Sequence, residues 1–180
     1  MWTILDKIFS KCARVYQRNV FLSKKNVQGG GDLLCYGKVY FFGAPRIQLG
    51  SNVRIWPGVS FAGDGTIVIG DNVSIGKDCN IYASKQGGVS IGDDVAIAAQ
   101  CYIIDSNHRT SKDELIRNQA LESQEIIIEH DVWISAGCAI VKGAKIRDGA
   151  VIGAGAVVNT EIPAYGIAAG VPARVIRMRT

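Results

Sequence analysis

The 180 residues suffice for one domain with a packed core and are few for two. Hydrophobic residues make up 48% of the chain, yet no apolar run approaches the roughly 18–20 residues that span a bilayer. These values exclude a disordered chain and a transmembrane protein. The net charge of +4 is modest, and aromatic residues are not interleaved with the basic ones as stacking platforms. We therefore expect no binding to nucleic acid.

The cysteines and the first residues bear on the compartment. The five cysteines are scattered, odd in number and form no CxxC pair, which argues against a zinc site or a disulfide framework. The first residues lack a basic segment followed by a long apolar stretch, so we expect no secretory signal. Both observations fit a cytoplasmic protein that holds no metal.

The apolar residues are of an unusual kind. The chain has 23 Ile and 17 Val but only 7 Leu, and its 21 glycines exceed the usual share. β-Branched residues favour strands, and glycine favours tight turns. The composition therefore predicts a protein built of strands and turns rather than of helices.

Residues 2–20 are the exception, because they have the periodicity of an amphipathic helix. Apolar side chains recur there at steps of three and four: Trp2, Leu5, Ile8, Phe9, Cys12, Val15, Tyr16 and Val20. The opposite face is basic and carries Lys7, Lys11, Arg14 and Arg18. We expect this helix to cap the open end of the domain that follows. The alternative is a helix that docks on a membrane surface or on a partner.

A six-residue period begins at Leu49, after a glycine-rich hinge at residues 28–31 and an irregular first coil at 32–48. Aliphatic or aromatic residues occupy every sixth position, with short insertions between runs: Leu49, Ile55, Phe61, Ile69, Ile75, Ile81, Ile91, Ile97, Ile103, Ile128, Ile134, Ile140, Ile146, Ile152 and Val158. Four positions after most of these stands a second small or apolar residue, such as Val73, Cys79 or Ala150.

This period predicts a parallel β-solenoid. Each unit is a short strand followed by a tight turn, with the first and fifth residues pointing inward. Three units make one triangular coil, and the coils stack with strands about 4.8 Å apart. A sandwich of short strands is the alternative, but it would show alternation with a period of two and hairpin turns.

The longest interruption of the period runs over residues 106–125. It is polar, and an excursion of this length from a tight solenoid is usually functional. We expect an extruded loop with a short helical turn near residues 112–118. Only two histidines exist: His108 stands at the base of this loop, and His130 stands at a repeat corner as an exposed turn residue.

The repeats resemble those of the hexapeptide-repeat acyltransferases, in the branch that acetylates galactosides, maltose and polysaccharides. Residues 69–76 (IGDNVSIG) and 152–158 (IGAGAVV) match the family's units, and the phrase AAGVPARVIR at 168–177 resembles its ending. The resemblance implies an all-β, left-handed parallel β-helix over residues 29–163, preceded by a helix and hinge at 1–28 and followed by a basic tail at 164–180. It also implies a homotrimer with active sites between neighbouring subunits.

The same resemblance implies an acetyl-CoA-dependent O-acetyltransferase that acts on a sugar hydroxyl. His108 matches the family's catalytic histidine, and an imidazole with a pKa near 6.5 suits the removal of a proton from an attacking hydroxyl. Asp105 is a candidate for fixing the imidazole tautomer, with plain capping of the loop as the alternative. Asn107 is a candidate for contacting the acceptor.

The coenzyme side of the resemblance lies in the last coils. It implies that acetyl-CoA contacts six residues: Trp133, Ala136, Ala154, Thr160, Arg174 and Arg177. The two arginines would meet the coenzyme's phosphates. The chain departs from the family pattern where Ala136 replaces a common serine, which leaves the oxyanion donor to Ser135 or to a backbone N–H. Thr160 stands where a lysine is frequent.

Three other functions stay open at this stage. One is O-acetylation of an antibiotic, and another is N-acetylation of an amino sugar. The third is a β-helix scaffold without catalysis. A γ-class carbonic anhydrase shares the fold but needs three histidine ligands, and the chain has two.

Overall fold

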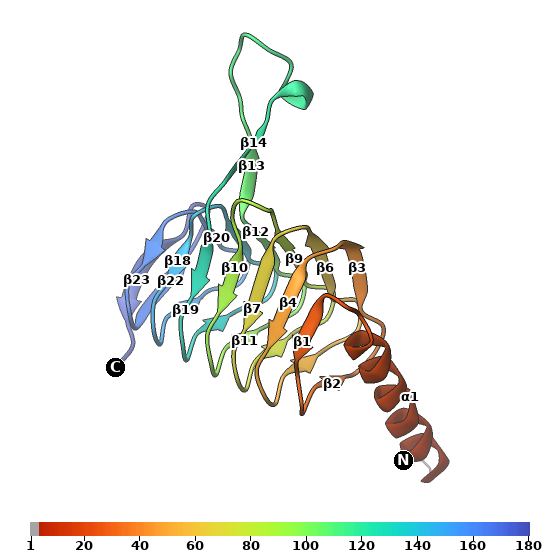
Figure 1. The fold of residues 1–180 in the computed structure, drawn as a ribbon. Helices are drawn as coiled ribbons and strands as arrows, with labels where there is room; N and C mark the ends of the chain where they lie inside the picture. The colour runs from red at the N-terminus through yellow and green to blue at the C-terminus, as the bar shows by residue number, and fades with distance from the viewer. Residues whose placement is uncertain (1–3) are drawn as a thin grey trace.

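The computed structural model describes residues 4–180, and side chains from residue 11 onward, as a left-handed parallel β-helix of about seven turns (Figure 1). One helix, α1 (Ile4–Leu22), precedes it. Each coil contributes one strand to each of three sheets, which we call A, B and C in the order in which the chain visits them. The predicted fold class is confirmed.

The strands of each sheet stack in parallel from the first coil to the last, with one exception at the C-terminus. Sheet A holds β1 (Val27–Gly29), β4 (Arg46–Leu49), β7 (Thr66–Ile69), β10 (Val89–Ile91), β15 (Ile126–Ile128), β18 (Lys145–Ile146) and β21 (Glu161–Ile162). Sheet B holds β2 (Leu34–Cys35), β5 (Arg54–Ile55), β8 (Ser74–Ile75), β11 (Ala96–Ile97), β16 (Trp133–Ile134), β19 (Val151–Ile152), β22 (Gly166–Ala169) and the antiparallel β23 (Arg174–Met178). Sheet C holds β3 (Tyr40–Gly43), β6 (Ser60–Gly63), β9 (Asn80–Ala83), β12 (Tyr102–Ile104), β17 (Ala139–Val141) and β20 (Val157–Val158).

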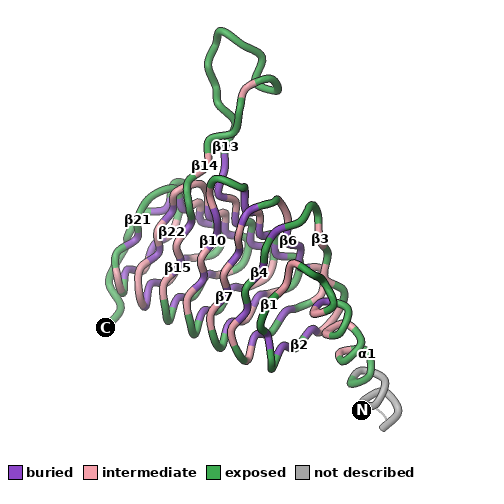
Figure 2. The backbone as a smooth tube through the Cα atoms, in the orientation of Figure 1, coloured by how far each residue is buried: buried purple, intermediate pink, exposed green. Residues whose placement is uncertain are grey.

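The core is the inside of the triangular prism. All fifteen predicted anchor positions are buried, and so are the small residues at position five, including Cys79, Cys101 and Cys138. The register shows why: Ile55 pairs with Ile75, which pairs with Ile97, so identical positions lie one above the other. Burial of this continuous aliphatic column drives the stacking, because a single coil cannot bury its own inward face. Figure 2 shows the buried residues running along the inside of the coils.

The corners between sheets A and B are built from Asn and Asp in left-handed backbone conformation. Asn52, Asn72, Asp94 and Asp131 have φ between 53° and 58°. The Asn52 side-chain amide donates to Asn72 (2.9 Å), and the Asn72 amide donates to Asp94 (3.0 Å). Asn and Asp accept this conformation more readily than other residues with a side chain.

This corner ladder gives a stability prediction. We expect Asn72→Ala to lower the free energy of unfolding by about 1–2 kcal/mol, because alanine disfavours the left-handed conformation and two hydrogen bonds are lost. Asn72→Gly should cost less, because glycine adopts the same φ without strain. Urea denaturation of the three proteins measures both effects, and equal stabilities of the alanine and glycine variants would contradict the conformational part.

The first coil is regular, contrary to the expectation for residues 32–48. Strands β2, β3 and β4 all pair in parallel with the next coil, and Phe41 pairs with Phe61 in the same register as later repeats. The reason is that Leu33, Cys35 and Ile47 fill the inward positions, although their types vary too much to reveal the period. The glycine-rich segment expected as a hinge overlaps β1, which pairs with β4.

The C-terminal segment 164–180, expected as a basic tail, completes sheet B. Strand β22 pairs with β19, and β23 folds back antiparallel onto β22. Arg174 lies opposite Ala169 and Arg177 lies opposite Ile167, so both arginines are carried by a strand at the end of the solenoid.

Candidate functional site

A two-stranded arm leaves the solenoid between sheets C and A, where the extruded loop was predicted. Strands β13 (Ser106–His108) and β14 (Leu121–Ser123) pair antiparallel, and a short 3-10 helix, η1 (Ile116–Asn118), lies near the tip. The rest of the arm is almost wholly exposed and projects away from the prism (Figures 1 and 2). The arm therefore presents its base, rather than its tip, to the surface of its own solenoid.

Asp105 anchors the arm from inside the solenoid. Its side chain is fully buried, and its Oδ2 accepts hydrogen bonds from the Ser84 N–H (2.8 Å), the Ser84 hydroxyl (3.0 Å) and the Gly88 N–H (2.6 Å). Its Oδ1 is buried without a partner. No hydrogen bond within residues 11–180 joins this carboxylate to His108, and its observed contacts fix the turn at residues 84–88 against the arm base.

His108 lies on the arm face that is turned toward a hollow in the solenoid surface. In the arm, His108 pairs with Leu121 and Ser106 pairs with Ser123. Directly opposite residues in an antiparallel pair project to the same face. Leu121 and Ser123 both line the hollow, and the pairing places the exposed His108 on their side of the arm, next to the lining residues but not among them.

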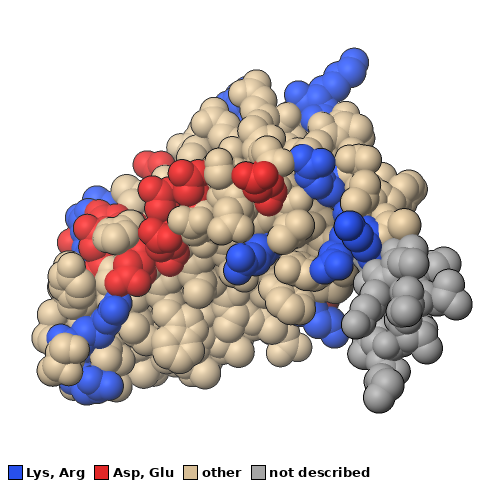
Figure 3. Space-filling view, turned by 90° about the horizontal axis from the view of Figure 1, so that it is seen from below, with Lys and Arg blue, Asp and Glu red and all other residues tan. Residues whose placement is uncertain are grey.

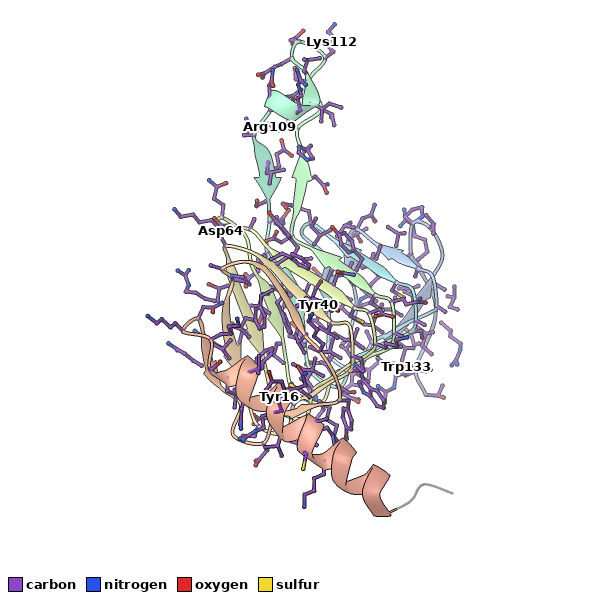
Figure 4. All side chains as sticks on the ribbon, turned by 90° about the vertical axis from the view of Figure 1, so that its right-hand side faces the viewer. Tyr16, Tyr40, Asp64, Arg109, Lys112 and Trp133 are labelled. Carbon is purple, nitrogen blue, oxygen red and sulfur yellow. The ribbon has the colours of Figure 1, made fainter. Side chains whose placement is uncertain are left out.

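The hollow has a volume of about 630 Å³ and lies at the base of the arm. Its other walls come from sheet C and the corner after β6 (Phe42, Gly43, Gly63, Asp64 and Tyr82), from the turn that Asp105 holds (Ser84, Lys85 and Gln86) and from Ala120 of the arm. Figure 4 shows Asp64 beside the arm base. Aromatic rings, a carboxylate and a lysine around one hollow suit a polar ligand with hydroxyl groups. Burial and the charge of Asp64 raise the pKa of Tyr82, so its hydroxyl stays a hydrogen-bond donor at neutral pH.

Sequence reasoning missed these wall residues, although one signal was present. The coil that carries the turn 84–88 is longer than the two before it. Paired residues across each of those two coils are 20 positions apart, as Ile47 and Ile67 are, whereas Ile67 and Val89 are 22 positions apart. The two additional residues form the turn that closes one side of the hollow.

Asn107 lies on the opposite face of the arm from His108. It pairs with Glu122, whose carboxylate lies 2.9 Å from the Lys142 ammonium and 3.6 Å from the Arg109 guanidinium. The hydrogen bond from Lys142 lowers the pKa of Glu122. Because strand residues alternate in direction, the structure separates Asn107 from His108 instead of bringing them together.

Three of the predicted coenzyme residues follow one line along the corner between sheets B and C. Ala136 and Ala154 occupy equivalent places on successive coils, and the Gly155 N–H donates to the Ala136 carbonyl (2.9 Å). Arg174 begins β23 next to the same corner. The two alanines are exposed and leave the corner free of bulky side chains. An extended, narrow ligand therefore has room to lie along it.

A second hollow of about 620 Å³ lies on the face of sheet B beside this corner, and Trp133 and Arg177 line it. Trp133 is 53% exposed. Arg179 is fixed there by Asp131 (2.9 Å) and by the Gly149 carbonyl (2.8 Å). Arg177, in contrast, forms no ion pair within residues 11–180, so its charge is available to an anion. Thr160 lies elsewhere, on the corner between sheets C and A.

The two hollows lie apart in one chain. His108 belongs to the arm between sheets C and A, whereas Trp133 and Arg177 belong to the face of sheet B, and the hollows share no residue. Figure 4 shows Arg109 on the arm and Trp133 well below it on another side of the solenoid. A single chain does not assemble all of the predicted site residues.

The remaining histidine and the cysteines take no part in either hollow. His130 is exposed at the corner before β16, as predicted. Four cysteines are buried, and burial raises the pKa of Cys35 to about 11. A thiol with such a pKa is a weak nucleophile at neutral pH. The fifth, Cys12, is exposed on α1.

Comparison with known proteins agrees with the fold. A family model described as "Hexapeptide repeat of succinyl-transferase" matches residues 66–104 and 125–160, which are the coils on either side of the arm. The match covers 75 of the 180 residues, so it identifies hexapeptide repeats in these coils. The match breaks at the arm, where the repeat itself is interrupted.

This hexapeptide-repeat protein is similar in sequence to enzymes of two acceptor chemistries. It is 47% identical over 64 residues to a galactoside O-acetyltransferase of Escherichia coli, which covers 36% of this chain and 32% of that protein. It is 44% identical over 52 residues to a 2,3,4,5-tetrahydropyridine-2,6-dicarboxylate N-acetyltransferase of Staphylococcus aureus, which covers 29% of this chain and 22% of that protein. The matched part is therefore no more than about a third of these relatives' length.

Two solved structures share the fold of this hexapeptide-repeat protein over most of its length. AntD, an N-acyltransferase from Bacillus cereus in complex with dTDP and coenzyme A, has a TM-score of 0.80 at 22% identity over 91% of this chain and 89% of that chain. A hexapeptide-repeat acetyltransferase from Vibrio cholerae in complex with acetyl-CoA has a TM-score of 0.64 at 19% identity over 98% and 90%. At these identities the likeness concerns the fold.

Proposed function

We propose that this chain is an acyl-CoA-dependent acyltransferase that transfers an acetyl group from acetyl-CoA to a sugar hydroxyl, with His108 as general base. The observation that carries the proposal is the position of His108 at the arm base, on the face turned to a hollow with aromatic, acidic and basic walls. The acceptor is a saccharide, either small or a polysaccharide precursor.

The proposed reaction needs few groups. A neutral ring nitrogen of His108 takes the proton of the acceptor hydroxyl while the hydroxyl oxygen attacks the thioester carbonyl carbon. The carbon–sulfur bond then breaks, and the imidazolium returns the proton to the leaving thiolate. No covalent acyl-enzyme is required, which agrees with the burial of four of the five cysteines. Asp105 acts as a positioning residue through the turn that forms one wall of the hollow.

We propose further that each complete site forms between two copies in a homotrimer. One copy supplies the arm with His108 and the hollow at the arm base, which we call the acceptor hollow. Its neighbour supplies the corner between sheets B and C, with Ala136, Ala154 and Arg174, and the face of sheet B with Arg177. The separation of the two hollows in one chain supports this arrangement, as does the family resemblance. An open solenoid face alone is also too shallow to enclose a reacting thioester.

We propose a backbone N–H as the donor for the tetrahedral intermediate, because the chain has Ala136 where the family's common serine stands. The N–H groups of Ser135 and Gly137 are taken by the carbonyls of Ile152 (2.9 Å) and Ala99 (3.0 Å). The Ala136 N–H between them makes no hydrogen bond within residues 11–180. We assign this exposed N–H as the oxyanion donor, since a fixed backbone dipole stabilises the developing charge without reorganisation.

The second candidate function is N-acetylation of an amino sugar attached to a nucleotide. The fold likeness to AntD favours it, because structures of that protein hold coenzyme A together with dTDP or dTDP-4-amino-4,6-dideoxyglucose. Lys85 at the hollow would suit the phosphate groups of such an acceptor.

Thiol release from acetyl-CoA, measured across sugars, nucleotide sugars, amino sugars and a hydroxyl-bearing antibiotic, tests the proposal. Thiol release with a hydroxyl acceptor, together with an alkali-labile product, supports O-acetylation and identifies the class of acceptor that reacts. An alkali-stable amide product assigns N-acetylation instead. If the protein releases no thiol with any acceptor and binds acetyl-CoA no better than an unrelated protein does, it is a scaffold. That result would overturn the proposal.

We expect Arg177→Ala to raise the KM for acetyl-CoA by a factor of about 10–100 with little change in kcat, because a charge-assisted contact to a phosphate contributes roughly 1.5–3 kcal/mol. Arg54→Ala is the matched control, since Arg54 is an exposed arginine on the same sheet in the first coils. Steady-state kinetics with varied acetyl-CoA measure both variants. An unchanged KM in Arg177→Ala would remove this residue from the coenzyme site.

A further inference from the structure

Helix α1 does not cap the solenoid with its apolar face, which corrects the expectation from the sequence. Its contact with the first coil uses the basic side: the Arg18 guanidinium donates to the Gly31 carbonyl (2.6 Å), and Arg14 lies over the Tyr36 ring at 5.6 Å. Among the helix side chains from residue 11 onward, Phe21 at the last turn is the one that is fully buried, against Phe41 and Phe61, and Leu22 beside it is partly buried. The rest of the helix extends past the end of the prism (Figure 1).

The apolar stripe of α1 consequently faces solvent. Tyr16 is 65% exposed, and Cys12 is exposed as well. Val15 and Val20, 51% and 39% exposed, stand at the edges of the stripe, where they also line shallow grooves between the helix and the first coil. Cys12 is three positions from Val15 and four from Tyr16, and Tyr16 is four from Val20, so the residues form one continuous face of the helix. In the sequence, Leu5, Ile8 and Phe9 continue the same spacing toward the N-terminus; their side chains lie outside the described residues. Exposure of so much of an amphipathic face indicates that something else covers it.

The charge around this helix face indicates which kind of surface covers it. From Asp6 to Asp64 the chain carries nine Lys or Arg residues and three acidic residues, Asp6, Asp32 and Asp64. The view from below shows Lys and Arg side chains dominating the end of the solenoid that carries the first coils, whereas most Asp and Glu side chains lie over later coils (Figure 3). A basic end that carries an exposed stripe of aromatic and aliphatic residues is complementary to an anionic lipid surface.

We propose that α1 is an interfacial helix that docks this protein on the surface of a membrane containing anionic lipids. The apolar stripe lies at the boundary of headgroups and acyl chains, with Tyr16 at headgroup level, and the basic first coils lie close to the lipid phosphates. No helix within residues 4–180 is long and apolar enough to cross a bilayer, so the contact is with one surface. The proposal does not depend on the acyltransferase function.

One consequence concerns the acceptor hollow. Phe42, in the wall of that hollow, belongs to the first coil, and its neighbour Phe41 packs on Phe21 of α1. Docking of α1 would bring this end of the hollow toward the lipid.

Sedimentation of the full-length chain with sucrose-loaded vesicles tests the proposal. We expect it to pellet with vesicles of phosphatidylcholine and about a third phosphatidylglycerol, and to bind far less to phosphatidylcholine alone. The double variant Tyr16→Ser, Val20→Ser should reduce the bound fraction at least about fivefold. The matched control Leu115→Ser removes an equally exposed leucine, at 61%, from the arm and should bind like wild type.

Far-UV circular dichroism and sedimentation velocity without vesicles accompany this test, so that misfolding or altered assembly is recognised. Val15→Ser provides a single change on the same stripe if the double variant unfolds, and it should also weaken binding. Wild-type protein that stays in the supernatant with both vesicle compositions would overturn the proposal, as would variants that bind as well as wild type. A smaller assembly for the variants, with no vesicle binding by wild type, would assign the stripe to a second copy of the chain.

Discussion

Replacement of His108 by alanine should lower kcat for acetyl transfer by a factor of about 10²–10⁴, because general-base catalysis contributes that much when the base is removed. The side chain is exposed and makes no hydrogen bond within the described residues. The substitution should therefore leave the free energy of unfolding within about 0.5 kcal/mol of wild type. A loss of rate without a loss of stability separates a catalytic role from a structural one.

The second histidine supplies the control for this prediction. His130→Ala removes the other exposed imidazole, at a solenoid corner next to the second hollow and away from the arm, and should leave kcat unchanged. The KM for acetyl-CoA should be similar in all three proteins, because His108 is assigned to proton transfer rather than to coenzyme binding. Thiol release by His108→Ala at the wild-type rate would defeat the proposed mechanism.

Replacement of Asp105 by alanine should destabilise the protein by about 3–5 kcal/mol, because it leaves two buried N–H donors and a hydroxyl without their acceptor. The turn at residues 84–88 and the arm base would then lose their common anchor. Activity should also fall, since Ser84 belongs to the wall of the acceptor hollow. Urea denaturation at matched protein concentration measures the first effect.

Two further variants sharpen the test of Asp105. Asp105→Asn keeps one oxygen acceptor for the Ser84 and Gly88 N–H groups but places its amide where Oδ1 has no partner, so its stability should be intermediate. Asp113→Ala, at the exposed part of the arm, should change stability by less than about 0.5 kcal/mol. An Asp105→Ala protein as stable as wild type would show that the three hydrogen bonds do not hold the turn.

The solenoid could be predicted from the sequence because its cause is local and repeated. Each unit places an aliphatic residue at position one and a small residue at position five, and burial follows directly from that spacing. The first coil was not recognised because Cys35, Phe41 and Ile47 fill the same positions with unlike residues. The arm was recognised because it interrupts the period, and the position of His108 at its base followed.

The acceptor hollow could not be predicted in the same way. Its walls come from Phe42, Asp64, Tyr82 and Leu121, which are far apart in sequence and meet only through the register of the coils and the pairing of the arm. The orientation of α1 could not be predicted from the sequence either. An amphipathic pattern identifies an apolar face but not its neighbour, and here cation–π and hydrogen-bond contacts of the basic face, with Phe21, decide the packing.

A mixed-oligomer experiment tests the central claim, that His108 of one copy acts on acetyl-CoA held by another. His108→Ala and the double variant Arg174→Ala, Arg177→Ala, each nearly inactive at low acetyl-CoA, are co-expressed with different tags and the mixed assemblies are isolated. If the site spans two copies, each isolated mixed trimer recovers about a third of the wild-type activity, because one of its three interfaces joins an intact His108 to intact arginines. Mixed assemblies no more active than the two variants alone would contradict a shared site.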